Sequence, residues 1–311
     1  MIAATIATTI ALTLSTPTGK LHGSLELPNT AGARVPVVLL VPGSGPDDRD
    51  GNTPLLPAKL DEYKLLAEGL AAHGIASLRY DKRGIGESAP AIQPYQSLGL
   101  GRYFVDQYHD VAGWIALLKK DPVFTGVAVV GHSEGSLVGM LAQQVTPADA
   151  FISLDGIGEN VHDTLIRQLT PGLPADLMAK MRVVLDANLA GHEAAPDPDL
   201  MKIPALASIS AQQAYMIEWM KHDPSQEIAK LNVPTLVIQG QYDTQVTMAD
   251  AEKLAAARPG IQLQVIPNMT HVLKAADATP ESQQATYTTG GLPLAPGLVE
   301  AIAEFVKATI K

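Results

Sequence analysis

The residues best suited to chemistry are Gly131-His132-Ser133-Glu134-Gly135, which follow the small and β-branched apolar residues Val127–Val130. The apolar run predicts a buried strand that ends at Val130, and a helical pattern begins near Gly135. Ser133 is therefore expected at the tip of a sharp strand-to-helix turn, with its hydroxyl exposed. The two glycines suit such a turn, because a side chain at either position would crowd its neighbours.

A serine hydroxyl is a weak nucleophile that needs a histidine base, and the base in turn needs a carboxylate to orient it. Where the serine sits on a turn of this kind, the order along the chain is serine, acid, histidine. Of the eight histidines, His271 alone follows a late predicted strand, which makes it the expected base. His132 is expected to pack beside the turn, and His73 to end a helix.

Asp243 is the expected acid. It lies one short loop beyond a predicted strand at Thr235–Gln239, and 28 positions before His271 (271 − 243). Asp155 is the alternative, because it ends the predicted strand after Ser133, where some serine hydrolases place their acid. The other interpretation of Asp155 is a hinge or a helix N-cap residue.

Acyl transfer also requires backbone N–H groups that stabilise the developing oxyanion. One is expected from Glu134, the residue after the serine, and the other from Ser44 in the loop after the predicted strand Val35–Val41. That loop, Pro42–Asn52, is long and rich in turn formers, and its Gly43-Ser44-Gly45 segment permits a close backbone approach.

Strand and helix patterns alternate along most of the chain, which predicts a parallel sheet with right-handed crossovers. The fold class expected is α/β: a mostly parallel twisted sheet flanked by helices, built from residues 1–155 and 231–311, with an N-terminal β-hairpin at 1–28. The alternation stops between residues 156 and 230, where proline-punctuated helical patterns predict an inserted helical cap. Apolar side chains of this cap are expected to line a substrate pocket, although such stripes are also typical of a plain core: Met178, Met181, Tyr215, Met216 and Trp219.

Composition excludes several classes of function. A formal charge of −10 argues against a nucleic-acid partner, and the absence of cysteine excludes disulfides, thiolate catalysis and zinc–thiolate sites. His192-Glu193 has no further ligands at metal spacing, so no metal or cofactor is expected. The apolar N-terminus, Met1–Leu14, is too short and threonine-rich to span a membrane. A cytoplasmic location and, if a signal peptide was trimmed, a periplasmic or secreted one both remain open, as does the oligomeric state.

Taken together, these motifs resemble those of α/β-hydrolase-fold serine hydrolases across nearly the whole chain. More narrowly, the chain is similar to bacterial esterases and S33-aminopeptidase-like hydrolases in its Gly-Ser-Gly-Pro…Asp-Arg-Asp-Gly-Asn loop, its Gly-His-Ser-Glu-Gly turn and its Asn268–Lys274 segment. The resemblance implies structural roles for Asp81 and Arg83, which tie loops together. Pro42-Gly43 departs from the His-Gly of many relatives, which leaves open which N–H of this loop faces the substrate.

The sequence therefore predicts a serine carboxylesterase that takes a small-molecule ester with a short-to-medium acyl or aryl group. An aminopeptidase or amidase using the same three residues is the alternative, and it would need an acidic subsite for a free amino group. A non-catalytic binding protein on the same fold is the third possibility. Dehalogenase and epoxide hydrolase chemistry is disfavoured, because both require a carboxylate at position 133.

Overall fold

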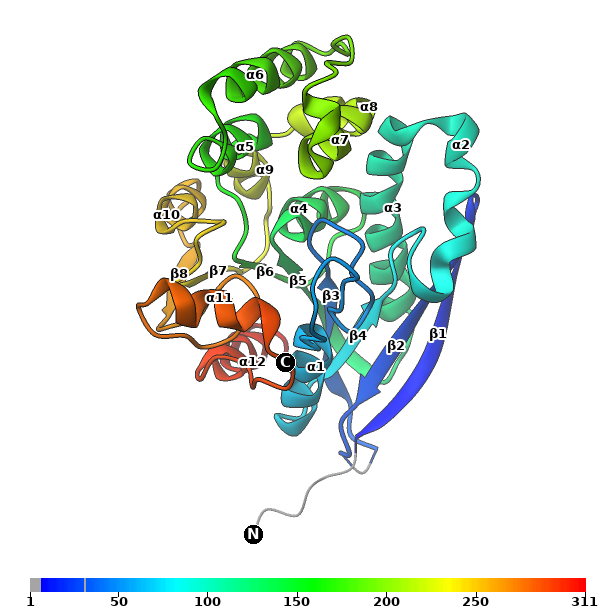
Figure 1. The fold of residues 1–311 in the computed structure, drawn as a ribbon. Coiled ribbons are helices and arrows are strands. Elements are labelled where there is room, and N and C mark those ends of the chain that lie inside the picture. The colour runs from blue at the N-terminus through cyan, green and yellow to red at the C-terminus, as the bar shows by residue number, and fades with distance from the viewer. Residues whose placement is uncertain (1–6, 31) are drawn as a thin grey trace.

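The computed structural model describes residues 7–30 and 32–311, and an eight-stranded sheet forms its centre (Figure 1). The strands lie in the order β1-β2-β4-β3-β5-β6-β7-β8. Strands β3 to β8 run parallel, which confirms the predicted α/β sheet. The strand bounds are Thr8–Thr16 (β1), Gly19–Leu27 (β2), Val35–Val41 (β3), Ala76–Tyr80 (β4), Phe124–His132 (β5), Ala150–Leu154 (β6), Thr235–Gly240 (β7) and Gln262–Ile266 (β8).

The N-terminal strands β1 and β2 form an antiparallel hairpin, and β2 joins the sheet antiparallel to β4. Residues 1–6 of the expected hairpin segment, where most of the signal peptide considered above would fall, lie outside the described residues. No helix among residues 7–30 and 32–311 is both long and apolar enough to cross a bilayer.

Helices cover both faces of the sheet, because its parallel strands are apolar on both sides. Successive side chains of a strand point to opposite faces. Val127 and Val129 of β5 accordingly pack in one core with α3 and α4, while Ala128 and Val130 pack in the other with α1 and α12. The bounds of these and the other helices outside the segment between β6 and β7 are Glu62–Ala72 (α1), Gly86–Ile92 (η1, a 3₁₀ helix), Tyr95–Leu98 (α2), Leu100–Lys119 (α3), Glu134–Val145 (α4), Met248–Ala256 (α10), Pro280–Thr288 (α11) and Leu298–Thr309 (α12).

A run of helices without strands lies between β6 and β7, and we refer to residues 156–230 as the helical insertion. It sits above the edge of the sheet where the parallel strands end (Figure 1). Helix α8 packs against α3 through Tyr215 and Trp219, whose rings lie 5.2 and 6.3 Å from the ring of Phe104. The insertion comprises Val161–Leu169 (α5), Ala175–Leu189 (α6), Leu200–Lys202 (η2, a 3₁₀ helix), Pro204–Ala211 (α7), Gln213–Met220 (α8) and Pro224–Ala229 (α9).

Helices α5 and α6 are joined by a charged contact at His162. Its Nδ1 and Nε2 lie 2.8 Å from carboxylate oxygens of Asp163 and Asp186, respectively. Burial alone would lower the pKa of His162, but its hydrogen bonds to Asp186 and Asp163 raise the pKa above the usual 6.5. A charged His162 therefore stabilises the packing of α5 on α6.

This contact predicts that the insertion loosens as the solution becomes alkaline. A raised folded-state pKa contributes stability that is complete below the unfolded pKa of about 6.5 and is lost as pH rises through the folded value. Hydrogen exchange in α5 and α6 should therefore accelerate relative to the sheet between pH 6 and 9. His162→Gln should show fast exchange already at pH 6; equal pH responses in both proteins would contradict the assignment.

Candidate active site

Ser133 lies in the one-residue turn between β5 and α4, with φ of 55° and ψ of −123°. Strand β5 continues to His132, two residues beyond the predicted end at Val130, so the turn is sharper than expected. A positive φ is strained for a residue with a side chain and is typical of functional sites. A Cβ on Gly131 would overlap the Gly135 carbonyl, and one on Gly135 would overlap the Val41 carbonyl, so both positions require glycine.

Asp243 and His271 are brought together by the loops that follow β7 and β8. The His271 Nδ1 lies 2.6 Å from Asp243 Oδ2, and Asp243 Oδ1 accepts the N–H groups of Gln245 and Val246 at 2.8 and 2.9 Å. Because the carboxylate can only accept, Nδ1 carries the hydrogen and Nε2 has a free lone pair. This is the tautomer required of a general base.

Ser133 and His271 border one cavity of about 290 Å³ together with Gly43 and Ser44. Within the described part of the chain, no hydrogen bond joins the Ser133 hydroxyl to the imidazole. Unliganded enzymes often have such contacts long or poorly aligned, and they tighten when substrate binds. The arrangement suits a serine nucleophile beside an oriented base.

His132 is neutral and fully engaged. Its Nε2 lies 2.9 Å from the His271 carbonyl, which can only accept, so Nε2 carries the hydrogen and Nδ1 accepts the Tyr63 hydroxyl at 2.8 Å. The Gly43 N–H in turn donates to Tyr63 Oη at 3.2 Å. Burial, and then the charge of His271, lower the pKa of His132 well below the usual range. His132 thus connects the loop of Gly43 to the loop of His271.

The backbone N–H groups of Ser44 and Glu134, on either side of Ser133, are among those that have no acceptor in the described residues. Glu134 is the first residue of α4, where helical geometry leaves N–H groups unpaired. Gly43 brings the other loop so close that a Cβ there would lie 3.1 Å from Ser133 Cβ. Both free donors therefore flank the serine.

Lys82 fixes the orientation of the Ser44 peptide. Its Nζ donates to the carbonyl of Gly43 and, at 2.8 Å, to that of Gly45. A trans peptide is planar, with its C=O and N–H on opposite sides. Holding the Gly43 carbonyl therefore directs the Ser44 N–H away from Lys82. Burial lowers the pKa of Lys82, although the charges of Glu134 and Asp47 oppose that change.

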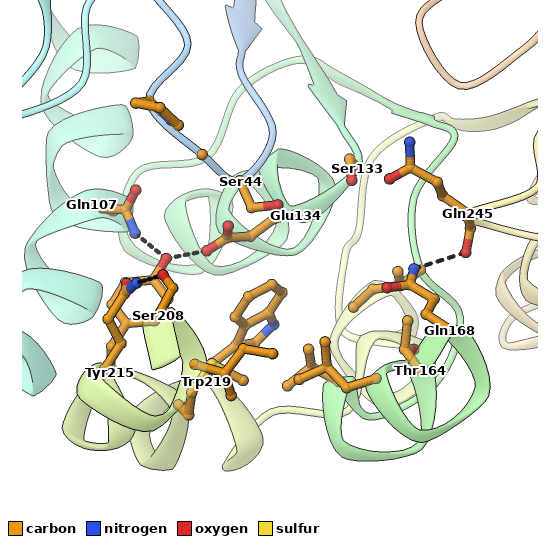
Figure 2. Close-up of a pocket in the computed structure, with 18 of the residues that line it drawn as sticks. Ser44, Gln107, Ser133, Glu134, Thr164, Gln168, Ser208, Tyr215, Trp219 and Gln245 are labelled. Atoms are coloured by element: carbon orange, nitrogen blue, oxygen red, sulfur yellow. Dashed lines mark hydrogen bonds between the residues drawn. The ribbon is translucent and has the colours of Figure 1, made fainter. Parts of the chain in front are cut away.

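A larger cavity of about 530 Å³ extends from Ser133 under the helical insertion, and Tyr215, Met216 and Trp219 line it (Figure 2). Met178 and Met181, predicted with them, do not line it. Both are buried where α6 packs on its neighbours, because a helical stripe shows that a face is covered but not by what. The pocket prediction therefore needs correction at these two methionines.

Asp155 is buried at the end of β6 and does not bond to His271 in the described residues. Its Oδ1 accepts the Gly240 N–H at 2.6 Å, while Oδ2 has no partner. Burial and then the charge of Asp243 raise the pKa of Asp155 well above its usual range. It is the N-cap of no helix in the described residues; it stands directly before the helical insertion and links the ends of β6 and β7.

A metal site at this cluster is disfavoured by its donors. Atoms of His132, Asp155 and His271 lie within 4.8 Å of one another. However, both nitrogens of His132 are already in hydrogen bonds, and His271 Nδ1 carries a hydrogen toward Asp243. Neutral imidazole lone pairs are what a metal needs, and one is available here at most.

The other charged residues near the site tie loops together. Asp81 accepts the N–H groups of Arg49 and Glu87 at 2.8 and 3.0 Å, and Arg83 forms a two-bond pair with Asp110 at 2.6 Å. Sequence reasoning missed the contacts of Tyr63 and Lys82, since a helix-face tyrosine and a loop lysine carry no spacing signal.

Comparisons with known proteins place this chain among hydrolases. The family described as serine aminopeptidase, S33, matches residues 58–275. Esterase EstD of Thermotoga maritima is 26% identical over 260 residues, which cover 81% of this chain and 58% of that protein. The chain thus spans a little over half the length of this curated relative.

Solved structures of similar shape include Est1E from Butyrivibrio proteoclasticus with bound ferulic acid, at a TM-score of 0.57 and 18% identity, covering 96% of this chain and 97% of that one. Acylaminoacyl peptidase from Pyrococcus horikoshii gives a TM-score of 0.59 at 15% identity, covering 98% of this chain and 42% of the peptidase. At these identities the likeness concerns the fold alone, and the predicted α/β-hydrolase fold is confirmed.

Proposed function

This chain belongs to the serine aminopeptidase S33 family of α/β-hydrolase-fold enzymes, and we propose that it is a serine carboxylesterase for short-to-medium acyl or aryl esters. The observation that carries the proposal is the Asp243–His271 pair at 2.6 Å beside a strained serine that opens onto a cavity lined by both apolar and polar side chains. The naming of the relative EstD as an esterase favours esters over peptides.

In the proposed mechanism, Ser133 Oγ attacks the ester carbonyl while His271 Nε2 accepts its proton. Asp243 keeps the imidazole in the required tautomer and stabilises the imidazolium. The free N–H groups of Ser44 and Glu134 hold the oxyanion, and His271 then protonates the leaving alcohol. Water releases the acyl group from Ser133 by the same steps in reverse, and residues 156–230 act as the cap over the acyl pocket.

Aminopeptidase or amidase activity is the second candidate, favoured by the description of the family and by the buried carboxylate of Glu134 beside the serine. A free amino group would have to bind that carboxylate. Aminopeptidase activity would require a cavity with net negative charge. The charged residues that line the large cavity are Lys82 and Glu134, whose charges have opposite signs, and this favours the esterase.

Hydrolysis of p-nitrophenyl acetate, butyrate and octanoate, measured beside aminoacyl p-nitroanilides, tests the proposal. We expect ester turnover by the natural protein and its loss, by at least about 10⁴-fold, in Ser133→Ala, because the acyl-enzyme can no longer form. If the anilides are hydrolysed faster than the esters, the protein is an aminopeptidase and the esterase proposal is wrong. Absence of both activities from folded protein would favour the binding-protein alternative.

A further inference from the structure

Glu134 has a buried carboxylate directly after the serine, although the proposed reaction needs only its backbone N–H. Its side chain is 4% exposed and borders the large cavity. Burying a carboxylate costs free energy unless it is hydrogen-bonded. An apolar side chain at this position would bind a plain acyl chain without that cost. The carboxylate therefore suits a substrate with a polar group that it can bind.

One oxygen of this carboxylate is held by protein and the other is open. Gln107 Nε2 donates to Tyr215 Oη at 2.7 Å, and the Tyr215 hydroxyl therefore donates onward to Glu134 Oε1 (Figure 2). Glu134 Oε2 accepts no hydrogen bond from the described residues. It is also not one of the fully buried polar atoms that lack a partner, so it is accessible to a bound molecule. The site thus presents a hydrogen-bond acceptor of fixed orientation.

The charges around this acceptor favour a neutral donor over a cation. Lys82 and Glu134 are the charged residues among those that line the large cavity, and the charge of Lys82 acts on the Glu134 carboxylate more strongly than the opposing charge of Asp47. An ammonium group bound at Oε2 would meet the field of Lys82 as well as that of the carboxylate. A hydroxyl needs only an acceptor and carries no charge to be repelled.

Building on the proposed function, we propose that Glu134 Oε2 binds a hydroxyl group on the acyl part of the substrate, so that the preferred substrates are hydroxy-substituted carboxylic esters. Because Glu134 adjoins Ser133 and borders the same cavity, the hydroxyl belongs on a carbon near the ester carbonyl. Tyr215 and Gln107 act as positioning residues that hold the carboxylate.

Three esters that differ only in the substituent at C3 test this subsite: methyl butyrate, methyl 3-hydroxybutyrate and methyl 3-aminobutyrate, each followed by pH-stat. We expect kcat/KM to be at least about tenfold higher for the hydroxy ester than for the plain ester, as a hydrogen bond to a charged group allows. In Glu134→Gln the Tyr215 hydroxyl would keep the amide oxygen, which turns the amide N–H₂ toward the cavity. A substrate hydroxyl can accept from this N–H₂, but only in a neutral hydrogen bond, so the hydroxy-to-plain ratio should fall several-fold.

Using the ratio removes any general effect of the substitution on the backbone at position 134. Thr164→Val, which removes a different polar group lining the cavity, is the matched control and should keep the natural ratio. A ratio near one in the natural protein, with methyl butyrate hydrolysed, would overturn the subsite and leave the esterase. Preference for the amino ester would overturn it in favour of a cation site. If neither these esters nor the p-nitrophenyl series is hydrolysed, the proposed function itself fails.

Discussion

Replacing Asp243 by asparagine is expected to lower kcat by about 10⁴-fold while leaving the fold intact. The reason lies in the two N–H groups of Gln245 and Val246 that point at Oδ1. They require an oxygen at that position, so the amide N–H₂ in Asp243→Asn faces His271. The imidazole must then accept at Nδ1 and carry its hydrogen on Nε2, which is the wrong tautomer for a base.

Asp155→Asn is the matched control, because the amide keeps the size and shape of the carboxyl group and retains one acceptor oxygen. Its oxygen can still accept the Gly240 N–H. We expect kcat within a few-fold of the natural value, measured with the same p-nitrophenyl ester and with unfolding temperatures compared. A large loss in Asp155→Asn with activity retained in Asp243→Asn would reverse the assignment of the acid.

Replacing Lys82 by methionine is expected to lower kcat by about 10²- to 10³-fold, the usual loss when one oxyanion donor is misplaced. Without the ammonium group, the Gly43 and Gly45 carbonyls lose their donor and the Ser44 N–H loses its fixed direction. Because the donor acts mainly on the transition state, KM should change much less than kcat.

Active-site titration with an organophosphate separates this effect from unfolding, since it counts the protein molecules that retain a reactive serine. The affinity of a trifluoromethyl ketone, which forms an oxyanion when Ser133 adds to it, should fall in parallel with kcat. A variant whose kcat per titrated site stays within threefold would show that Lys82 merely fills space. Lys119→Met, an exposed lysine that also donates to a backbone carbonyl, controls for loss of the charge.

The parts of this molecule that sequence could predict are those encoded by short patterns. Continuous apolar runs identify strands buried on both faces, and Asp243 follows one such strand, β7, by one short loop. His271 follows β8, an exposed edge strand whose polar and apolar residues alternate. Loops after parallel strands gather at one edge of the sheet, so order along the chain was enough to bring these two residues together.

Contacts between distant segments could not be predicted in this way. Lys82 reaches the carbonyl of Gly43 across 39 positions, and Tyr215 reaches Glu134 across 81. Nothing local distinguishes a lysine that clamps a loop from one in solvent. The stripe with Met178 illustrates the same limit, since helical periodicity reveals a covered face but not whether protein or substrate covers it.

The helical insertion is bonded to the reactive residues at two separate points, and this has a kinetic consequence. At one side Gln168 of α5 donates to the Gln245 carbonyl at 2.9 Å, beside the N–H that holds Asp243; at the other, Tyr215 of α8 donates to Glu134. Any displacement of the insertion would therefore break the contacts at both ends of the proposed site together. For the proposed esterase we therefore expect an opening equilibrium of these helices, if substrate entry requires one, to scale kcat for every ester by the same factor.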